Sequence, residues 1–284
     1  MLKYKLIPLL FSLKMMLCNC HYEKRESGFE TGTRQYKVSK TGQLPGSIPE
    51  SSGLATDSAR QTFWTHNDGG SKPELFKIDL SGNLLQTIPL KNLKNEDWED
   101  LAQDPSGNLY IGDFGNNNNR RRDLKIYKLN PANPALADSI SFRYEDQQDF
   151  PPAPEDRNFD CEAFFWHADS LYLFSKNRGS KLVKMYTLPA TPGQYVAKVR
   201  GTVRLKSMVT GAAINPGGTQ FALLSYGKVF VFNITNPANL LQEPSVCIKI
   251  ARNQAEAIAY TNDTDFAITN EQGRIYRVTR KRRK

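Results

Sequence analysis

The sequence has few of the residues that commonly identify an enzyme or a zinc protein. Its 284 residues include three histidines and four cysteines, and the cysteines do not have metal-type spacing. It also lacks a nucleophile elbow, a phosphate-binding glycine loop and a His-Glu zinc motif. The sequence therefore gives no support to serine hydrolases, P-loop enzymes or zinc enzymes.

Long hydrophobic runs are also scarce. The N-terminal apolar run, Leu6–Leu13, follows Lys3 and Lys5 and is too short to span a bilayer. A basic start and a short apolar stretch are typical of a secretion signal. The Leu17-Cys18-Asn19-Cys20 stretch resembles a bacterial lipobox and would make Cys20 the lipidated residue. We therefore expect export to the cell envelope, in the periplasm or anchored to a membrane through Cys20.

No long amphipathic helix with caps at both ends is recognisable. Strand-forming residues are plentiful, and 39% of the residues are hydrophobic and 11% aromatic. This composition is typical of a folded domain rather than a disordered chain. The sequence predicts an all-β protein.

Five short segments resemble one another, each with an oxygen-bearing residue at the start of a small apolar strand. These residues are Ser52, Glu99, Glu162, Thr210 and Glu256. They recur every 46 to 48 residues except for one interval of 63, which suits four-stranded propeller blades. A five-bladed β-propeller is the prediction, with six blades or a sandwich of ordinary meanders as alternatives.

The last repeat has three evident strands, whereas the strand-like segment 34–39 precedes the first repeat. Pairing that segment onto the last blade would close the ring and protect two edges. The expected organisation is a signal at 1–20, a linker at 21–32, the propeller at 33–279 and a basic tail at 280–284. Cys161 and Cys247 fall on an inner and an outer strand of different repeats, so we expect two buried thiols.

Ring closure would bring Glu99, Glu162 and Glu256 together on one axis. Two like charges 4 Å apart repel by about 4 kcal/mol at an effective dielectric of 20. Such carboxylates must share protons, meet a basic side chain or bind a cation, and none of the five ring positions is basic. We predict a Ca²⁺ site because the donors are hard oxygens, with all five ring residues as candidate ligands: Ser52, Glu99, Glu162, Thr210 and Glu256.

The order of ring residues resembles the calcium site of the five-bladed calcium-dependent apyrase family. The segments Ser52–Ala55, Glu74–Asp79 and Asp97–Ala102 are more similar to the bacterial SdiA-regulated propeller family. Both resemblances imply five blades and bound calcium over residues 50 to 279. The SdiA-regulated family has no settled enzymatic activity, so this resemblance implies a fold and a metal rather than a reaction.

An enzymatic alternative is calcium-dependent hydrolysis of phosphoesters, nucleotides or lactones at the polar mouth of the propeller. Arg120–Arg122, Lys176 and Arg178 are candidate phosphate contacts there, and Asp68 or Asp113 is a candidate base. Lactonase propellers offer a second comparison, with His66 as a candidate base, but they have six blades. Whether the protein is an enzyme stays open.

The formal charge of +9 includes five charges from the tail 280–284. No stacking aromatics accompany this charge, so nucleic acid is not an expected partner. We expect an exported calcium-binding propeller with a binding or scaffolding role, whose partner is an unidentified small molecule or protein at the mouth.

Overall fold

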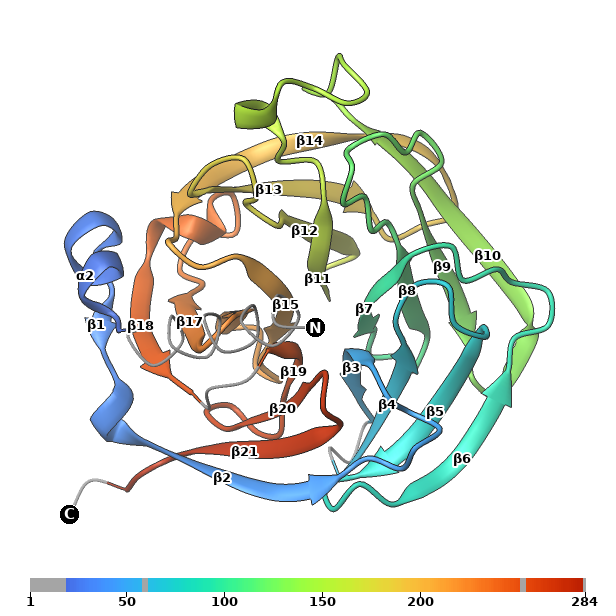
Figure 1. The fold of residues 1–284 in the computed structure, drawn as a ribbon, viewed down its shortest axis with the longest axis horizontal. Coiled ribbons are helices and arrows are strands. Elements are labelled where there is room, and N and C mark those ends of the chain that lie inside the picture. Colours follow the sequence, from blue (N-terminus) through green and yellow to red (C-terminus); the bar gives the residue numbers. More distant parts are fainter. Residues whose placement is uncertain (1–18, 58–60, 251–253, 283–284) are drawn as a thin grey trace, which may run out of the picture.

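The computed structural model describes residues 19–57, 61–250 and 254–282. It is almost entirely β-structure, with antiparallel meanders arranged around a central axis like the blades of a propeller (Figure 1). The leader proposed for residues 1–20 lies outside the described part except for its last two residues. The last two residues of the basic tail, 283 and 284, also lie outside the described part.

Successive strands pair with their neighbours in sequence. One four-stranded sheet contains β3 (Ser51–Thr56), β4 (Thr62–Asn67), β5 (Glu74–Asp79) and β6 (Leu84–Pro89). The next meander contains β7 (Trp98–Gln103), β8 (Leu109–Asp113), β9 (Lys125–Asn130) and β10 (Asn133–Tyr144). It is followed by β11 (Cys161–His167), β12 (Ser170–Ser175), β13 (Leu182–Pro189) and β14 (Gly193–Arg204). These two meanders form one eight-stranded sheet because their outer strands, β10 and β14, pair in parallel.

The C-terminal half continues the pattern. A sheet is formed by β15 (Val209–Ile214), β16 (Gln220–Ser225), β17 (Lys228–Asn233) and β18 (Pro244–Lys249), with β1 (Glu30–Thr31) added at its outer edge. The last sheet contains β19 (Ala255–Tyr260), β20 (Phe266–Asn270), β21 (Arg274–Arg280) and β2 (Tyr36–Gln43). Short 3-10 helices lie at Thr33–Gln35, Pro154–Asp156 and Leu240–Gln242.

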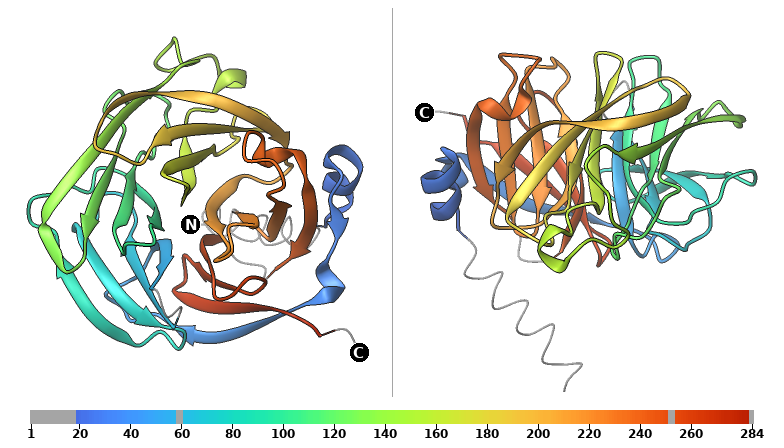
Figure 2. Two further views of the ribbon diagram at one scale, coloured as in Figure 1. Left: turned by 180° about the vertical axis from the view of Figure 1, so that it is seen from behind. Right: turned by 90° about the horizontal axis from the view of Figure 1, so that it is seen from above.

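The inner strands close a ring around the axis. Each contacts the next in the order β3, β7, β11, β15 and β19, and β19 contacts β3 again. The outer edge of the last meander is filled by β2, which pairs antiparallel with β21 from Tyr36 opposite Arg280 to Gln43 opposite Arg274. This pairing of the N-terminal strand agrees with the closure predicted from the sequence, and Figures 1 and 2 show β2 lying along β21.

Hydrophobic cores fill the spaces between adjacent meanders. Along β16, for example, Phe221 and Leu223 join one core, whereas Ala222 and Leu224 join the core on the opposite face. Successive side chains of a strand point to opposite faces of the sheet. Strands buried on both faces therefore carry near-continuous apolar runs, which is why the repeats were visible in the sequence.

The N-terminal segment packs against the outside of the β15–β18 sheet. The helix α2 (His21–Ser27) precedes β1, which pairs in parallel with β18. Glu23 in this helix is fully buried, and its two carboxylate oxygens accept hydrogen bonds from Lys228 Nζ at 2.7 and 2.8 Å. Residues 21–32, expected to be a linker, thus contain ordered elements held by a buried ion pair.

A disulfide joins Cys20 to Cys247, whereas Cys161 is a buried free thiol. The expectation of a free thiol was wrong for Cys247. Cys20 had been assigned to the leader, so Cys161 was the one cysteine considered as a disulfide partner of Cys247. The disulfide also engages the sulfur that a lipid anchor at Cys20 would require. In this structure, membrane attachment through Cys20 and the disulfide exclude each other. Among the described residues, no helix has the length and apolar character needed to cross a bilayer.

Candidate metal centre

The five predicted ring residues occupy equivalent irregular positions. In each pairing of an inner strand with its neighbour, the register shifts near the start of the inner strand, at Ser52, Thr210, Glu162, Glu256 and the Glu99-Asp100 step. One extra residue on the inner strand is left out of the ladder, which is a β-bulge. Bulges redirect side chains and are frequent at functional sites. The repeat in the sequence therefore corresponds to a repeated backbone feature.

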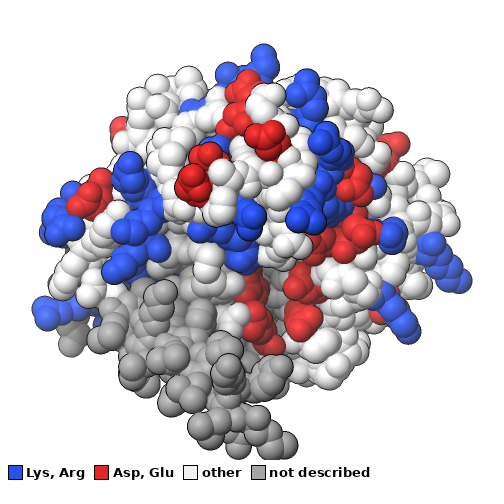
Figure 3. Space-filling model, turned by 45° about the horizontal axis from the view of Figure 1, so that its top comes forward, with Lys and Arg blue, Asp and Glu red and all other residues white. Residues whose placement is uncertain are grey.

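Four of these residues line one cavity of about 140 Å³ at the end of the channel where the inner strands begin. They are Ser52, Glu99, Glu162 and Glu256. The other residues around the cavity are Glu50, Asp68, Asp97, Asn117, Lys176, Arg178, Tyr226 and Glu271. Figure 3 shows Asp and Glu side chains running through the middle of one face of the molecule, bordered by Lys and Arg side chains.

Thr210 is not among the residues that line this cavity. Its hydroxyl is buried and donates a 2.8 Å hydrogen bond to the carbonyl oxygen of Ala255 on the neighbouring inner strand. This hydrogen bond from the bulged residue Thr210 links β15 to β19.

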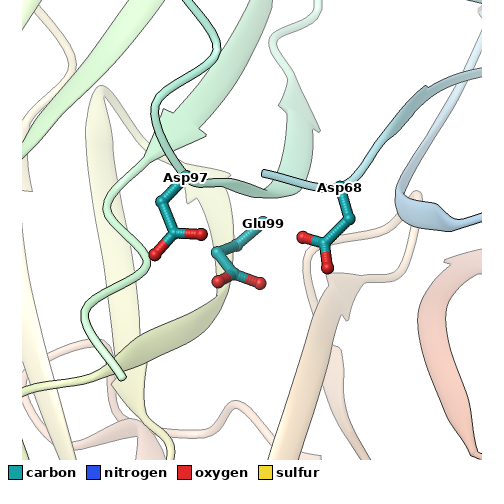
Figure 4. Close-up of side chains that lie close together, drawn as sticks. All are labelled: Asp68, Asp97 and Glu99. Atoms are coloured by element: carbon teal, nitrogen blue, oxygen red, sulfur yellow. The ribbon is translucent and has the colours of Figure 1, made fainter. Parts of the chain in front are cut away.

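Asp68, Asp97 and Glu99 bring their carboxylates together on one side of the cavity (Figure 4). One oxygen from each lies within 4.8 Å of the others. Burial and the neighbouring acids Glu162 and Asp68 raise the pKa of Glu99 well above its ordinary value. Burial and Asp68 also raise the pKa of Asp97, to about 6. These acids therefore form a group whose negative charge is poorly compensated.

Two glycines make this convergence possible. A Cβ on Gly115 would lie 2.2 Å from Glu99 Oε1 and 2.5 Å from Asp97 Oδ2. A Cβ on Gly69 would lie 2.3 Å from Asp97 Oδ1. Because a side chain at either position would occupy the space of the carboxylates, glycine lets the two loops lie against the acids without displacing them.

The loop that carries Gly115 is held by Arg121. The guanidinium donates to the carbonyl oxygen of Gly115 at 2.9 Å and to Asp113 Oδ1 at 3.0 Å. The same Asp113 oxygen accepts from the backbone N–H of Asp97 at 3.1 Å. Asp113, one of the two candidate bases, therefore supports the loop behind the acids and does not line the cavity.

The opposite side of the cavity carries basic side chains. Lys176, 5% exposed, donates a hydrogen bond to Glu162 Oε2. Arg178 donates from Nε to Asp160 Oδ2 at 2.5 Å and from Nη2 to Glu162 Oε1 at 3.1 Å. Burial raises the pKa of Glu162, and Lys176 partly opposes that effect. None of the five ring positions is basic, but Lys176 and Arg178 reach Glu162 from the loop after β12, so this glutamate meets basic side chains as well as other acids.

Glu256 has a different partner. Burial and Glu162 raise its pKa well above the ordinary value, and its carboxyl group is hydrogen-bonded to that of Glu271. Glu271 in turn accepts a hydrogen bond from Gln254 Nε2. This carboxyl pair is suited to share a proton.

Asp97 and Asp160 were not predicted as site residues, and Asp68 was proposed only as a base. Asp97 and Asp160 each precede a ring glutamate by two residues, in the segments Asp97-Trp98-Glu99 and Asp160-Cys161-Glu162. Glu50 stands in the same relation to Ser52. Extending the repeat by two residues towards the N-terminus would have identified all three acids.

Another buried acid, Asp100 on β7, also escaped prediction. Its Oδ2 atom accepts hydrogen bonds from the backbone N–H groups of Phe164 at 3.1 Å and Ala212 at 3.2 Å, on two other inner strands. Burial raises its pKa well above the ordinary value despite these bonds. Asp100 therefore links three inner strands beside the acidic cavity.

The remaining candidates lie outside the cavity. His66 is fully buried, with Nδ1 2.9 Å from the carbonyl oxygen of Asn67, and burial lowers its pKa. None of Arg120, Arg121 and Arg122 lines the cavity. Arg122 instead lies over the Phe150 ring, 3.7 Å from its centroid.

No family model matches this chain, and no curated protein is similar to it in sequence. Among solved structures, a gluconolactonase from Xanthomonas campestris resembles it with a TM-score of 0.47 and 11% sequence identity. The similarity covers 87% of this chain and 90% of the gluconolactonase chain. At this TM-score we draw no conclusion from the likeness.

Proposed function

We propose that this protein is a five-bladed β-propeller that binds Ca²⁺ in its axial acidic cavity and serves a binding or scaffolding role. The five blades are the meanders that begin with β3, β7, β11, β15 and β19, with β2 as the outer strand of the last. Support for the blade count comes from the closed order of contacts among the five inner strands.

The environment of Glu99 carries the metal proposal. Glu99 is 8% exposed, and the charged neighbours that most affect its pKa are all acids: Glu162, Asp68, Asp160 and Asp97. A buried carboxylate usually has a cationic or hydrogen-bonding partner. The described residues provide no ion pair for Glu99, and a cation between Asp68, Asp97 and Glu99 supplies the missing positive charge.

The chemistry of the donors favours calcium. Asp68, Asp97 and Glu99 offer carboxylate oxygens, and Ser52, which carries a hydroxyl, lines the same cavity. Hard oxygen donors are preferred by Ca²⁺, whereas Zn²⁺ is usually bound through nitrogen or sulfur. We propose Asp68, Asp97 and Glu99 as the principal ligands and retain Ser52, Glu162 and Glu256 as further candidates. Thr210 is left out because its hydroxyl is bonded to Ala255.

Such an ion would connect separate blades. Asp68 follows β4 in the first meander, Asp97 and Glu99 belong to the second, and Glu162 lies in the third. An ion held by these residues would stabilise the ring and fix the loops at its mouth.

Calorimetry with the full chain tests the proposal directly. We expect one strong Ca²⁺ site per chain and a higher melting temperature in Ca²⁺ than in chelator, because a ligand that binds only the folded state stabilises it. Absence of calcium binding together with identical melting curves in both conditions would disprove the metal site. Anomalous scattering from crystals grown with calcium would locate the ion.

Calcium-dependent hydrolysis is the second candidate function. One observation favours it: Lys176, Arg178 and Asn117 border the same cavity as the acids. A bound metal ion can polarise a phosphoryl or carbonyl oxygen. Lys176 and Arg178 would then hold an anionic oxygen of the substrate, and Asp68 would serve as a ligand of the ion rather than as the candidate base. Turnover of nucleotides, phosphoesters or lactones that depends on calcium would support this function, and inactivity with intact calcium binding would leave the binding role.

We also propose export, supported by the Cys20–Cys247 disulfide. Disulfides persist in oxidising compartments and are rare in the bacterial or eukaryotic cytosol. Mass spectrometry of the protein from its native cell should find a disulfide-linked peptide pair containing Cys20 and Cys247. A lipid-modified Cys20, or two reduced thiols, would contradict the disulfide and the structure of the N-terminal segment.

A further inference from the structure

The net charge of the protein is concentrated in two segments of its sequence. The strand β2 and the chain from Arg274 to the C-terminus contain no acidic residue and nine basic ones: Lys37, Lys40, Arg274, Arg277, Arg280, Lys281, Arg282, Arg283 and Lys284. Of 38 Lys and Arg residues in the chain, the other 29 are matched by 29 Asp and Glu residues. The whole formal charge of +9 is therefore accounted for by these two segments.

The fold places β2 beside the described part of the second segment, although more than 200 residues separate them in the sequence. The β2–β21 ladder sets Tyr36 opposite Arg280 and Ser39 opposite Arg277. Pairing extends beyond β21, since the N–H of Lys281 donates to the carbonyl oxygen of Gln35 at 2.8 Å. Figure 1 shows the C-terminal end of β21 beside the start of β2, at the rim of the ring. We call the seven described basic residues of this pair the basic edge.

The basic edge is exposed and largely free of ion pairs. Lys37, Lys40, Arg280, Lys281 and Arg282 are exposed. Within the described residues, the ion pair formed by this edge is that of Arg277 with Asp265, at 3.6 Å. Asp265 also accepts from the backbone N–H of Arg280 at 2.9 Å. The ion pair with Asp265 therefore offsets only a small part of the positive charge of the basic edge.

The aromatic side chains next to the basic edge indicate which class of anionic partner it can bind. Tyr36 is 8% exposed, and Tyr276 is partly buried against the core, so neither aromatic ring stands free to stack on a base. Binding of single-stranded nucleic acid depends on such stacking. A basic edge on the rim of the ring, without aromatic platforms, is instead suited to a surface of anionic head groups, to which each nearby Lys or Arg contributes independently.

We propose that the basic edge docks this protein on membranes that contain anionic phospholipid. Binding occurs through the exposed Lys and Arg side chains at the membrane surface, without insertion into the bilayer. The proposal concerns the rim of the ring and does not depend on the calcium site.

Vesicle co-sedimentation of the full chain tests this docking. Wild-type protein is mixed, in EDTA and low salt, with vesicles of phosphatidylcholine alone or of phosphatidylcholine with phosphatidylglycerol. The edge variant carries Lys37→Gln, Arg280→Gln, Lys281→Gln and Arg282→Gln. The control variant removes the same charge elsewhere, at exposed residues whose side chains make no hydrogen bond or ion pair among the described contacts: Lys91→Gln, Arg143→Gln, Lys198→Gln and Lys206→Gln.

Wild-type and control proteins should bind the anionic vesicles, and added salt should weaken that binding. Each Lys or Arg near an anionic surface is worth roughly five-fold in affinity, so the four substitutions of the edge variant should together weaken binding by roughly 600-fold. Circular dichroism and melting curves verify that all three proteins are folded. Equal binding to neutral vesicles, equal losses in the two variants, or binding to a single-stranded oligonucleotide but not to vesicles would each overturn the proposal.

Discussion

The two sides of the axial cavity differ in how the negative charge of their buried carboxylates is compensated. On one side, Asp160 and Glu162 are compensated by Arg178 and Lys176. On the other side, Asp68, Asp97 and Glu99 converge without an ion pair of their own among the described residues. A carboxylate group compensated within the protein serves structure, whereas an uncompensated one is available to a cation.

This difference matters because Glu99 belongs to both groups. Glu99 offers an oxygen within 4.8 Å of oxygens from Asp68 and Asp97, and it likewise offers one within 4.8 Å of oxygens from Asp160 and Glu162. The basic side chains therefore lower the total negative charge of the cavity without reaching its uncompensated side. Substitutions on the two sides should have opposite effects on the calcium-free protein.

The largest effect is expected from Lys176→Met. The substitution removes the buried ammonium group beside Glu162 and leaves a buried carboxylate with Arg178 as its remaining basic partner. Breaking a buried ion pair by removing one partner costs about 3–5 kcal/mol. We expect that loss in the free energy of unfolding, measured by denaturant titration in chelator, with partial recovery in Ca²⁺.

Lys184→Met provides the matched control for this experiment. Lys184 pairs with Asp146 at 2.6 Å, but the two side chains are 18% and 31% exposed. Such a partly exposed pair contributes about 1 kcal/mol or less. Similar losses in the two variants would show that Lys176 does not neutralise a buried acid.

Glu99→Gln tests the uncompensated side. The amide removes a charged ligand, and we expect Ca²⁺ affinity measured by calorimetry to fall by about 100-fold or more. The calcium-free variant should be more stable than wild type by about 1–2 kcal/mol, because it lacks a buried carboxylate repelled by its neighbours. Glu155→Gln, at an exposed position, is the control. Unchanged calcium affinity, or lower stability in chelator, would contradict the assigned role of Glu99.

The sequence predicted the ring because its strands repeat and are buried on both faces. Closure by the N-terminal strand was predictable since one repeat lacked an outer strand and one strand lacked a repeat. The convergence of Ser52, Glu99, Glu162 and Glu256 on one cavity was also predictable, because equivalent positions of the inner strands meet at the axis.

The details of the site depend on features that strand periodicity does not contain. Asp97 and Asp160 precede their strands, and their positions are set by loop backbone and by contacts such as that of Asp113 with the N–H of Asp97. The pairing of Lys176 with Glu162 depends on how the loop after β12 turns back over the cavity. Cys20 was assigned to a leader, so its pairing with Cys247 across 227 residues was not considered.

Gly115→Ala should weaken calcium binding without removing any ligand. The new methyl group would lie 2.2 Å from Glu99 Oε1, so the loop or the carboxylates must move apart. Changes in the groups that orient metal ligands typically cost 10- to 100-fold in affinity, and we expect about ten-fold by calorimetry. Gly46→Ala is the control, because a Cβ there meets no atom within 4 Å. Equal affinities of the two variants would show that Gly115 does not shape the site.

The smallest expected effect is a pH dependence that reverses with calcium. Burial and Asp68 raise the pKa of Asp97 from 3.8 to about 6. The folded calcium-free protein therefore binds more protons than the unfolded chain between these values. The contribution of Asp97 to the free energy of unfolding should be greatest below pH 4 and should be lost as the pH rises through 6. Burial also raises the pKa values of Glu99 and Glu256, so these two groups change stability with pH in the same direction as Asp97.

Calcium competes with these protons, so its affinity should increase as the pH rises through 6. Melting curves recorded from pH 4.5 to 7.5 should thus show calcium stabilisation that grows with pH, while the chelated protein loses stability. Asp97→Asn should flatten both trends, since the amide does not titrate. If the two trends are as steep in this variant as in wild type, Asp97 is not the group that couples proton and calcium binding. The uncompensated side of the cavity would then consist of Asp68 and Glu99 alone.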